Sequence, residues 1–185
     1  MATPSSDCGR RAFRALLAAF LFAGCAQQPQ PANNPVGNLL GLIAQRLAVA
    51  DDVARSKWNS GAPVEDLTRE REIVAAIGSE APHYGLDPAF AMDFFHAQIE
   101  ASKIVQNARL TEWRTVKQPA FANPPDLQRD IRPRLDALTP ALLLALARAL
   151  PDLRAPGALK MPDARAGDAA YDAATAPLRR LAAGD

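Results

Sequence analysis

The fold of this chain is organised by residues 46–70, which read RLAVADDVARSKWNSGAPVEDLTRE. Arg46 and Lys57 are eleven positions apart, so at about 100° per residue they point within about 20° of each other on a helix. The face they share is otherwise apolar and carries Leu39, Ile43, Ala50, Val53 and Ala54. Because an unpaired charge in a core is very costly, these cations need an anionic partner, either a protein carboxylate or a ligand.

Length and composition place the chain among globular proteins. Its 185 residues fit one domain with room for a sizeable core. It is 49% hydrophobic and 22% charged, with a net charge of +1, which is ordinary for a globular domain. The near-neutral balance argues against binding of nucleic acid, which favours a basic surface. No segment after the N-terminal region approaches the roughly 18 consecutive apolar residues of a membrane span.

The first 25 residues have the pattern of a secretory signal peptide. Arg10, Arg11 and Arg14 form its basic part, and residues 15–23 form a short apolar run that leads into small residues. We therefore exclude residues 1–25 from the fold and expect the protein in the periplasm or outside the cell.

Two modes of cleavage are compatible with this signal. Residues 21–25 (LFAGC) resemble a bacterial lipobox, although Phe22 stands where leucine is usual, and cleavage there would leave a lipid anchor on Cys25. Ordinary cleavage before Gln27 fits equally well. We favour ordinary export and keep the lipid anchor as the alternative.

Cysteines and histidines are scarce in this chain. The two cysteines, Cys8 and Cys25, belong to the signal region. No disulfide framework is therefore expected in the folded domain, despite the oxidising compartment. His83 and His96 are isolated, so no metal site is predicted.

The mature chain is predicted to be an all-α, single-domain helical bundle. Residues 26–34 (AQQPQPANN) are rich in proline and glutamine and are expected to form a flexible tether, which leaves residues 35–185 for the domain. Asn34 and Asp87, each followed by proline, mark helix starts, and no stretch alternates as a strand would. The helices that we expect, with long first and third members, span about residues 35–58, 66–79, 87–114 and 169–181.

Prolines interrupt the helical pattern between the third and the last of these helices. Residues 127–138 carry leucine and isoleucine at helical spacing, and Pro133 either starts that helix or kinks it. Residues 139–140 (TP) then precede a separate Leu/Ala-rich helix that reaches Leu150.

The third helix has a polar side and a mixed side. The polar, outer side is expected to carry Asp93, His96, Glu100, Lys103, Asn107, Thr111 and Arg114. The opposite side holds apolar residues and also four polar ones that need hydrogen-bond partners, namely Gln98, Ser102, Gln106 and Arg109. We interpret Gln98 as structural, and Arg109 and Trp113 as pairing and packing residues.

Polar groups from three helices therefore converge. Arg69 lies on the buried side of the second helix, with Glu70 at its margin and Asp66 nearby. The chain offers no Ser/His/Asp or Cys/His set for nucleophilic catalysis and no carboxylate pair suited to glycoside hydrolysis. A cation-rich site suits the binding of a small dicarboxylate and a reaction that depends on electrostatic stabilisation. The inward set is Arg46, Lys57, Arg69, Ser102 and Gln106.

An ordered series of motifs runs through this part of the chain. It comprises QRL at 45–47, VAD at 49–51, KW at 57–58, PVEDLTRE at 63–70, QIEAS at 98–102, Gln106 and Trp113. The series resembles the all-α (AroQ) class of chorismate mutases, and specifically its exported, monofunctional gamma subclass. The spacings Arg-x10-Lys, Lys-x8-Asp-x2-Arg-Glu and Ser-x3-Gln are those of that family's active site. The resemblance covers about residues 36–138.

The resemblance implies an isomerase that converts chorismate to prephenate by a Claisen rearrangement. This step of the shikimate pathway to aromatic amino acids uses no cofactor and no covalent intermediate. By the same resemblance, Arg46 and Arg69 would bind substrate carboxylates. Lys57 would contact a carboxylate and the ether oxygen, and Gln106 would donate a second hydrogen bond to that oxygen.

The resemblance also implies roles for three smaller contacts. Glu70, with Asp66 nearby, would accept a hydrogen bond from the substrate hydroxyl, and Ser102 would contact a carboxylate of the substrate. Asp66 is equally well explained as the N-cap of the second helix.

One more arginine of the site should come from the C-terminal half. Arg132, in DIRP at 130–133, is the best match, with Arg129 and Arg134 as alternatives. The helices after Leu138 match poorly, and this chain lacks a cysteine pair that an exported relative carries there. A homodimer with each site built within one protomer is a further implication.

A competing function is that of a non-catalytic periplasmic helical protein that binds a small anion or a protein partner. Arg46 or Lys57 alone would fit a salt-bridged core cation better than a functional group. Their shared face, together with Arg69, favours a functional site.

Gln106 makes the pH dependence of the expected activity a test. Some members of the family have a glutamate there, which donates to the ether oxygen only when protonated, whereas glutamine donates at any pH. Activity is therefore expected to persist from neutral into mildly alkaline pH in a measured pH–rate profile. A rate that collapsed above about pH 5–6, as a glutamate of ordinary or slightly raised pKa would impose, would count against Gln106 in this role.

Overall fold

The computed structural model describes residues 34–155 and 168–184. Its elements are α1 (Pro35–Ser60), α2 (Leu67–Glu80), the 3₁₀ helix η1 (Ala81–Tyr84), α3 (Pro88–Thr115), the π-helical turn η2 (Leu127–Ile131), α4 (Arg132–Arg154) and α5 (Ala169–Ala183). These ranges contain no strand, and α1 and α3 are long, at 26 and 28 residues. The prediction of an all-α bundle is therefore confirmed.

Two sequence predictions concern residues outside this part of the chain. The expected signal peptide, residues 1–25, and residues 26–33 of the expected tether lie outside the described residues. Within the described ranges, no helix is long and apolar enough to cross a lipid bilayer.

Helix starts follow the capping residues that the sequence predicts. Side-chain oxygens of Asn34, Asp66 and Asp87 accept hydrogen bonds from the backbone N–H three residues on, at 2.9, 3.1 and 2.8 Å. These bonds satisfy donors that a first helical turn leaves free. At the other end of α1, Gly61 has a φ of 70° and its N–H donates to the carbonyl of Lys57 at 2.8 Å. A left-handed glycine therefore ends the helix.

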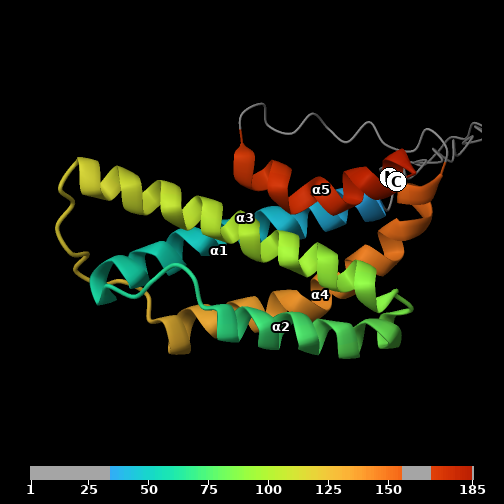
Figure 1. The fold of residues 1–185 in the computed structure, drawn as a ribbon, viewed down its shortest axis with the longest axis horizontal. Coiled ribbons are helices and arrows are strands. Elements are labelled where there is room, and N and C mark those ends of the chain that lie inside the picture. The colour runs from blue at the N-terminus through green and yellow to red at the C-terminus, as the bar shows by residue number, and fades with distance from the viewer. Residues whose placement is uncertain (1–33, 156–167, 185) are drawn as a thin grey trace, which may run out of the picture. The chain divides into compact units, whose positions relative to one another are not determined.

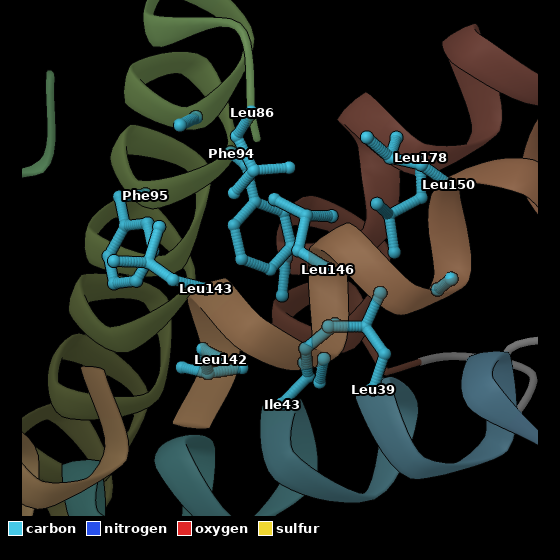
Figure 2. Packing of buried hydrophobic residues seen from close by; sticks show 14 of the residues in the cluster. Leu39, Ile43, Leu86, Phe94, Phe95, Leu142, Leu143, Leu146, Leu150 and Leu178 are labelled. Atoms are coloured by element: carbon cyan, nitrogen blue, oxygen red, sulfur yellow. The ribbon is translucent and has the colours of Figure 1, made fainter. Parts of the chain in front are cut away.

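α3 is the helix against which most of the others pack. It contacts α1, α2 and α5, while α4 packs mainly against α1, as can be followed in Figure 1. Burial of each large apolar side chain between them contributes about 1.5–3 kcal/mol, so this packing fixes the directions of the helices that carry polar groups. The residues labelled in Figure 2 show the largest buried cluster: Leu39 and Ile43 of α1, Leu86, Phe94 and Phe95, Leu142, Leu143, Leu146 and Leu150 of α4, and Leu178 of α5.

The loop after α3 returns to the end of α1. The side-chain amide of Asn59 donates to the carbonyl of Phe121 at 2.8 Å and accepts from the N–H of Phe121 at 3.0 Å. The ring of Phe121 packs against Trp113, with 4.9 Å between ring centroids, and Trp113 packs against Trp58 at 5.8 Å. Held in this way, the chain enters η2 and α4 beside α1.

α4 corrects the sequence prediction of two helices in this region. Residues 132–154 form one continuous helix, with Pro133 in the first turn, where no N–H is needed. Pro140 lies inside the helix and is exposed. Its missing hydrogen bond is outweighed by burial of the leucines that follow it. α4 also bends along its length in Figure 1, as helices with interior prolines often do.

Two proline substitutions in α4 form a matched pair. Pro140→Ala is expected to raise the free energy of unfolding by about 1–3 kcal/mol, because alanine restores the missing donor and favours the helix interior. Pro133→Ala should change it by less than about 1 kcal/mol, because proline suits a first turn. Urea unfolding of both variants tests this difference. A Pro140→Ala protein that is no more stable than Pro133→Ala would show that the continuous helix is wrong.

Candidate active site

A cavity of about 390 Å³ lies between α1, α2, α3 and the start of α4. Val53, Ile73 and Ile99 form part of its apolar wall. The fold thus brings together side chains from four separate helices. The polar wall contains all the residues that the sequence assigns to the site: Arg46, Lys57, Asp66, Arg69, Glu70, Ser102, Gln106 and Arg132.

Arg46 is buried, with 8% of its surface exposed. Among the described residues no carboxylate lies within ion-pair distance of it, and its Nη1 donates only a long hydrogen bond of 3.4 Å to the carbonyl of Gln98. Burial lowers the pKa of Arg46 to about 10, well below the ordinary value of a guanidinium, which corresponds to a cost of about 3 kcal/mol for keeping the cation in the fold. An anion in the cavity would offset this cost.

Lys57 faces the same cavity from the last turn of α1. Its Nζ donates to the carbonyl of Val64 at 2.7 Å, in the loop that leads to α2. Burial lowers the pKa of Lys57, the carboxylates of Asp66 and Glu70 oppose the shift, and the charge of Lys103 adds to it. The cavity therefore holds a second cation that burial disfavours.

The start of α2 sets the geometry of Asp66 and Glu70. Asp66 caps the helix by accepting from the N–H of Arg69, and the N–H of Asp66 donates to Oε1 of Glu70 at 3.2 Å. Asp66 thus combines a capping role with a place in the cavity wall. Arg69 lies nearer the solvent, because its side chain is 43% exposed and pairs with Glu72 at 3.3 Å.

Ser102 and Gln106 form a hydrogen-bonded pair on α3. Gln106 is buried, and its Nε2 donates to Oγ of Ser102 at 3.0 Å and to the Ser102 carbonyl at 3.2 Å. Its Oε1 is also buried and has no hydrogen-bond partner in the described part of the chain. A buried amide oxygen without a partner is unfavourable, so this Oε1 is an acceptor that a donor group of a bound ligand could satisfy.

The three C-terminal arginines occupy different places. Arg132 lines the cavity, and its Nη1 donates to Oε1 of Gln128 at 2.6 Å. Arg134 instead pairs with Asp52 at 2.6 Å, and the side chain of Arg129 is 81% exposed. The geometry therefore favours Arg132 over both alternatives.

Lys103 does not lie on the outer side of α3, where the sequence predicts it. α2 packs against α3, and only 13% of the Lys103 side chain is exposed. Its Nζ lies 3.2 Å from Oε2 of Glu70 and 2.6 Å from Oε1 of Glu100, and it lines the cavity. The pattern of one helix cannot show which neighbour covers its polar side. One feature of the sequence could have indicated the position of Lys103: Glu70 is expected at the inner margin of α2, and a carboxylate there needs a cation on the facing helix.

Two other polar residues of the predicted inner side of α3 have contrasting surroundings. Gln98 is fully buried, and its Nε2 donates to the carbonyl of Ala174 in α5 at 2.7 Å, which confirms a structural role. Arg109 does not face the core: its side chain is 47% exposed and pairs with Asp51 at 2.6 Å and Glu112 at 3.0 Å. Its predicted direction was wrong, and its pairing role is confirmed.

The sequence of this chain is similar to those of known proteins. Residues 37–107 match the family described as chorismate mutase type II. The chain is 34% identical over 140 residues to a secreted chorismate mutase of Mycolicibacterium smegmatis, covering 76% of this chain and 77% of that protein.

Two solved structures resemble the fold. The chorismate mutase of Burkholderia phymatum has a TM-score of 0.68 and 33% identity, covering 78% of this chain and 96% of that one. The chorismate mutase of Burkholderia thailandensis has a TM-score of 0.62 and 35% identity, covering 82% of this chain and 98% of that one.

Arg46→Met is expected to raise the free energy of unfolding by about 1–3 kcal/mol at neutral pH, because it removes a buried cation and keeps most of the apolar stem. The pKa of Arg46 is depressed in the fold, so the cost of the cation is fully present below about pH 10 and declines at higher pH. The gain over the wild type, measured by urea unfolding, should therefore shrink at the highest accessible pH.

Arg55→Met is the matched control on the same helix. The side chain of Arg55 is 45% exposed and pairs with Asp51 at 2.8 Å, so its removal should change the free energy of unfolding by less than about 1 kcal/mol. If Arg46→Met lost more stability than Arg55→Met, the guanidinium of Arg46 could not be a costly, unpaired group.

Proposed function

Because this chain belongs to the chorismate mutase family, we propose that it converts chorismate to prephenate in the cavity described above. The observation that carries this proposal is the pair of cations, Arg46 and Lys57, which face the cavity without a carboxylate in ion-pair contact among the described residues. Chorismate has two carboxylates, so the cavity and the substrate are complementary in charge.

The reaction is intramolecular: one C–O bond breaks and one C–C bond forms. No proton is transferred and no covalent bond to the protein is needed. Catalysis therefore depends on holding the compact, diaxial conformer and on stabilising the charge that develops. Guanidinium groups suit the first task because they bind carboxylates in a fixed, forked geometry. We assign the binding of the substrate carboxylates, which holds this conformer, to Arg46, Arg69 and Arg132.

Lys57 and Gln106 are the proposed donors to the ether oxygen. Negative charge grows on that oxygen as the C–O bond breaks, so these hydrogen bonds strengthen in the transition state and lower the barrier. Lys57 is held by the carbonyl of Val64 and keeps further N–H groups for the ether oxygen. Nε2 of Gln106 donates to Ser102 at 3.0 and 3.2 Å, so one of these two bonds would be exchanged for the bond to the ether oxygen when the substrate binds. Loss of one such donor typically costs roughly 3–4 kcal/mol.

The remaining contacts are assigned to polar groups at the sides of the cavity. Glu70, with Asp66 nearby, accepts a hydrogen bond from the substrate hydroxyl, and Ser102 contacts a carboxylate of the substrate. Support comes from their places in the wall of a cavity of about 390 Å³, a volume within the usual range for small-molecule sites.

We also propose that the catalytic domain, residues 35–185, is exported. Residues 1–25 would be a secretory signal peptide and residues 26–34 a tether, and the relative named as secreted supports export. Ordinary cleavage is favoured over a lipid anchor on Cys25. The eight proposed site residues line one cavity of a single chain, so in the homodimer that we propose by resemblance to the family each protomer would have its own site.

Turnover of chorismate tests the proposed function. The protein expressed from its full-length sequence should consume chorismate, followed by loss of its absorbance. Arg46→Ala and Lys57→Ala should each lower kcat/KM by at least about 10²-fold. Lys117→Ala is the control, because Lys117 is exposed and does not line the cavity, and it should keep wild-type activity. If the wild type leaves chorismate unchanged, a non-catalytic anion-binding protein is the better account. If all four proteins consume it at equal rates, Arg46 and Lys57 are not catalytic groups.

A further inference from the structure

Lys103 is a cation of the cavity wall for which the proposed mechanism has no role. Its Nζ lies 3.2 Å from Oε2 of Glu70, across the interface between α3 and α2. We propose that Lys103 is a positioning residue. It holds the carboxylate of Glu70 in the orientation that accepts a hydrogen bond from the substrate hydroxyl. This inference rests on the proposed function and adds a residue to the same site.

The carboxylate of Glu70 is held from two sides. Its Oε1 accepts from the N–H of Asp66 at the start of α2, at 3.2 Å, and its Oε2 contacts Lys103. A glutamate side chain that is fixed before the substrate arrives does not lose rotamer freedom on binding. Each carboxylate oxygen has two lone pairs, so these contacts leave capacity for the hydroxyl.

The surroundings of Lys103 distinguish positioning from substrate binding. Glu100, at 2.6 Å, is a second carboxylate partner of Lys103 and does not line the cavity. With two carboxylates in contact, the Lys103 ammonium is already neutralised, unlike Arg46 and Lys57. The side chains of Lys103 and Glu70 are 13% and 18% exposed, so solvent screens their attraction less than it screens a surface pair.

α3 offers a matched control for the loss of an ion pair. Arg109 also joins α3 to a carboxylate of a neighbouring helix, Asp51 at 2.6 Å, and to a second one on its own helix, Glu112 at 3.0 Å. Arg109 does not line the cavity. A role that is merely structural would make Lys103→Met and Arg109→Met similar in activity.

The test is a double-mutant cycle in the full-length protein, with kcat and KM for chorismate measured for each variant. Lys103→Met should lower kcat/KM about tenfold, Lys103→Arg should restore it to within about threefold of the wild type, and Arg109→Met should stay within about twofold. In a Glu70→Gln background, Lys103→Met should change kcat/KM by less than about twofold, because Lys103 acts through Glu70. Lys103→Gln replaces the methionine variant if that protein does not fold.

Three outcomes overturn the inference. Equal losses from Lys103→Met in the wild-type and Glu70→Gln backgrounds would mean that Lys103 acts independently of Glu70. A loss no larger than that of Arg109→Met would mean that Lys103 has only a structural role. Either result, with an active wild type, leaves the proposed function intact. A wild type that does not convert chorismate overturns both.

Discussion

A buried guanidinium without a carboxylate partner is the constraint on which the rest of this structure depends. Arg46 is 8% exposed and reaches only a backbone carbonyl at 3.4 Å within the described residues. Well-packed apolar residues are often as stable as buried ions, or more so, so the arginine is hard to explain by stability. Its presence on the inner face of α1, one wall of a cavity, is better explained by an anion that completes it. Given the chain's membership of the chorismate mutase family, we propose that this anion is the dicarboxylate substrate.

The fold delivers the other groups to this cavity by different means. Lys57 shares the face of α1 with Arg46, so helical periodicity alone brings it there. Glu70 is placed by the reciprocal contacts that start α2. The position of Arg132 depends on a tertiary contact: the side-chain amide of Asn59 holds the loop after α3, so that α4 begins beside α1. Local caps, periodicity and one tertiary contact together assemble a site from distant parts of the chain.

The sequence predicts what is encoded locally. Asn34, Asp66 and Asp87 locate the helix starts because a cap acts within one turn, and one helical face identifies Arg46 and Lys57. What depends on neighbouring helices is harder to predict, and two of the three wrong predictions, those for Lys103 and Pro140, have this cause. Lys103 reads as a surface residue because its own helix does not reveal that α2 covers it. Pro140 is predicted to start a new helix because the sequence does not show that burial of the leucines after it, against other helices, keeps α4 continuous.

Binding of prephenate, measured by titration calorimetry, tests the central claim most directly, because it separates recognition of a dicarboxylate from turnover. The account predicts saturable binding of one molecule per chain, an affinity at least about tenfold lower in Arg46→Met, and much weaker binding of the monocarboxylate benzoate. Equal affinity of the wild type and Arg46→Met for prephenate, or no binding to the wild type, would contradict it.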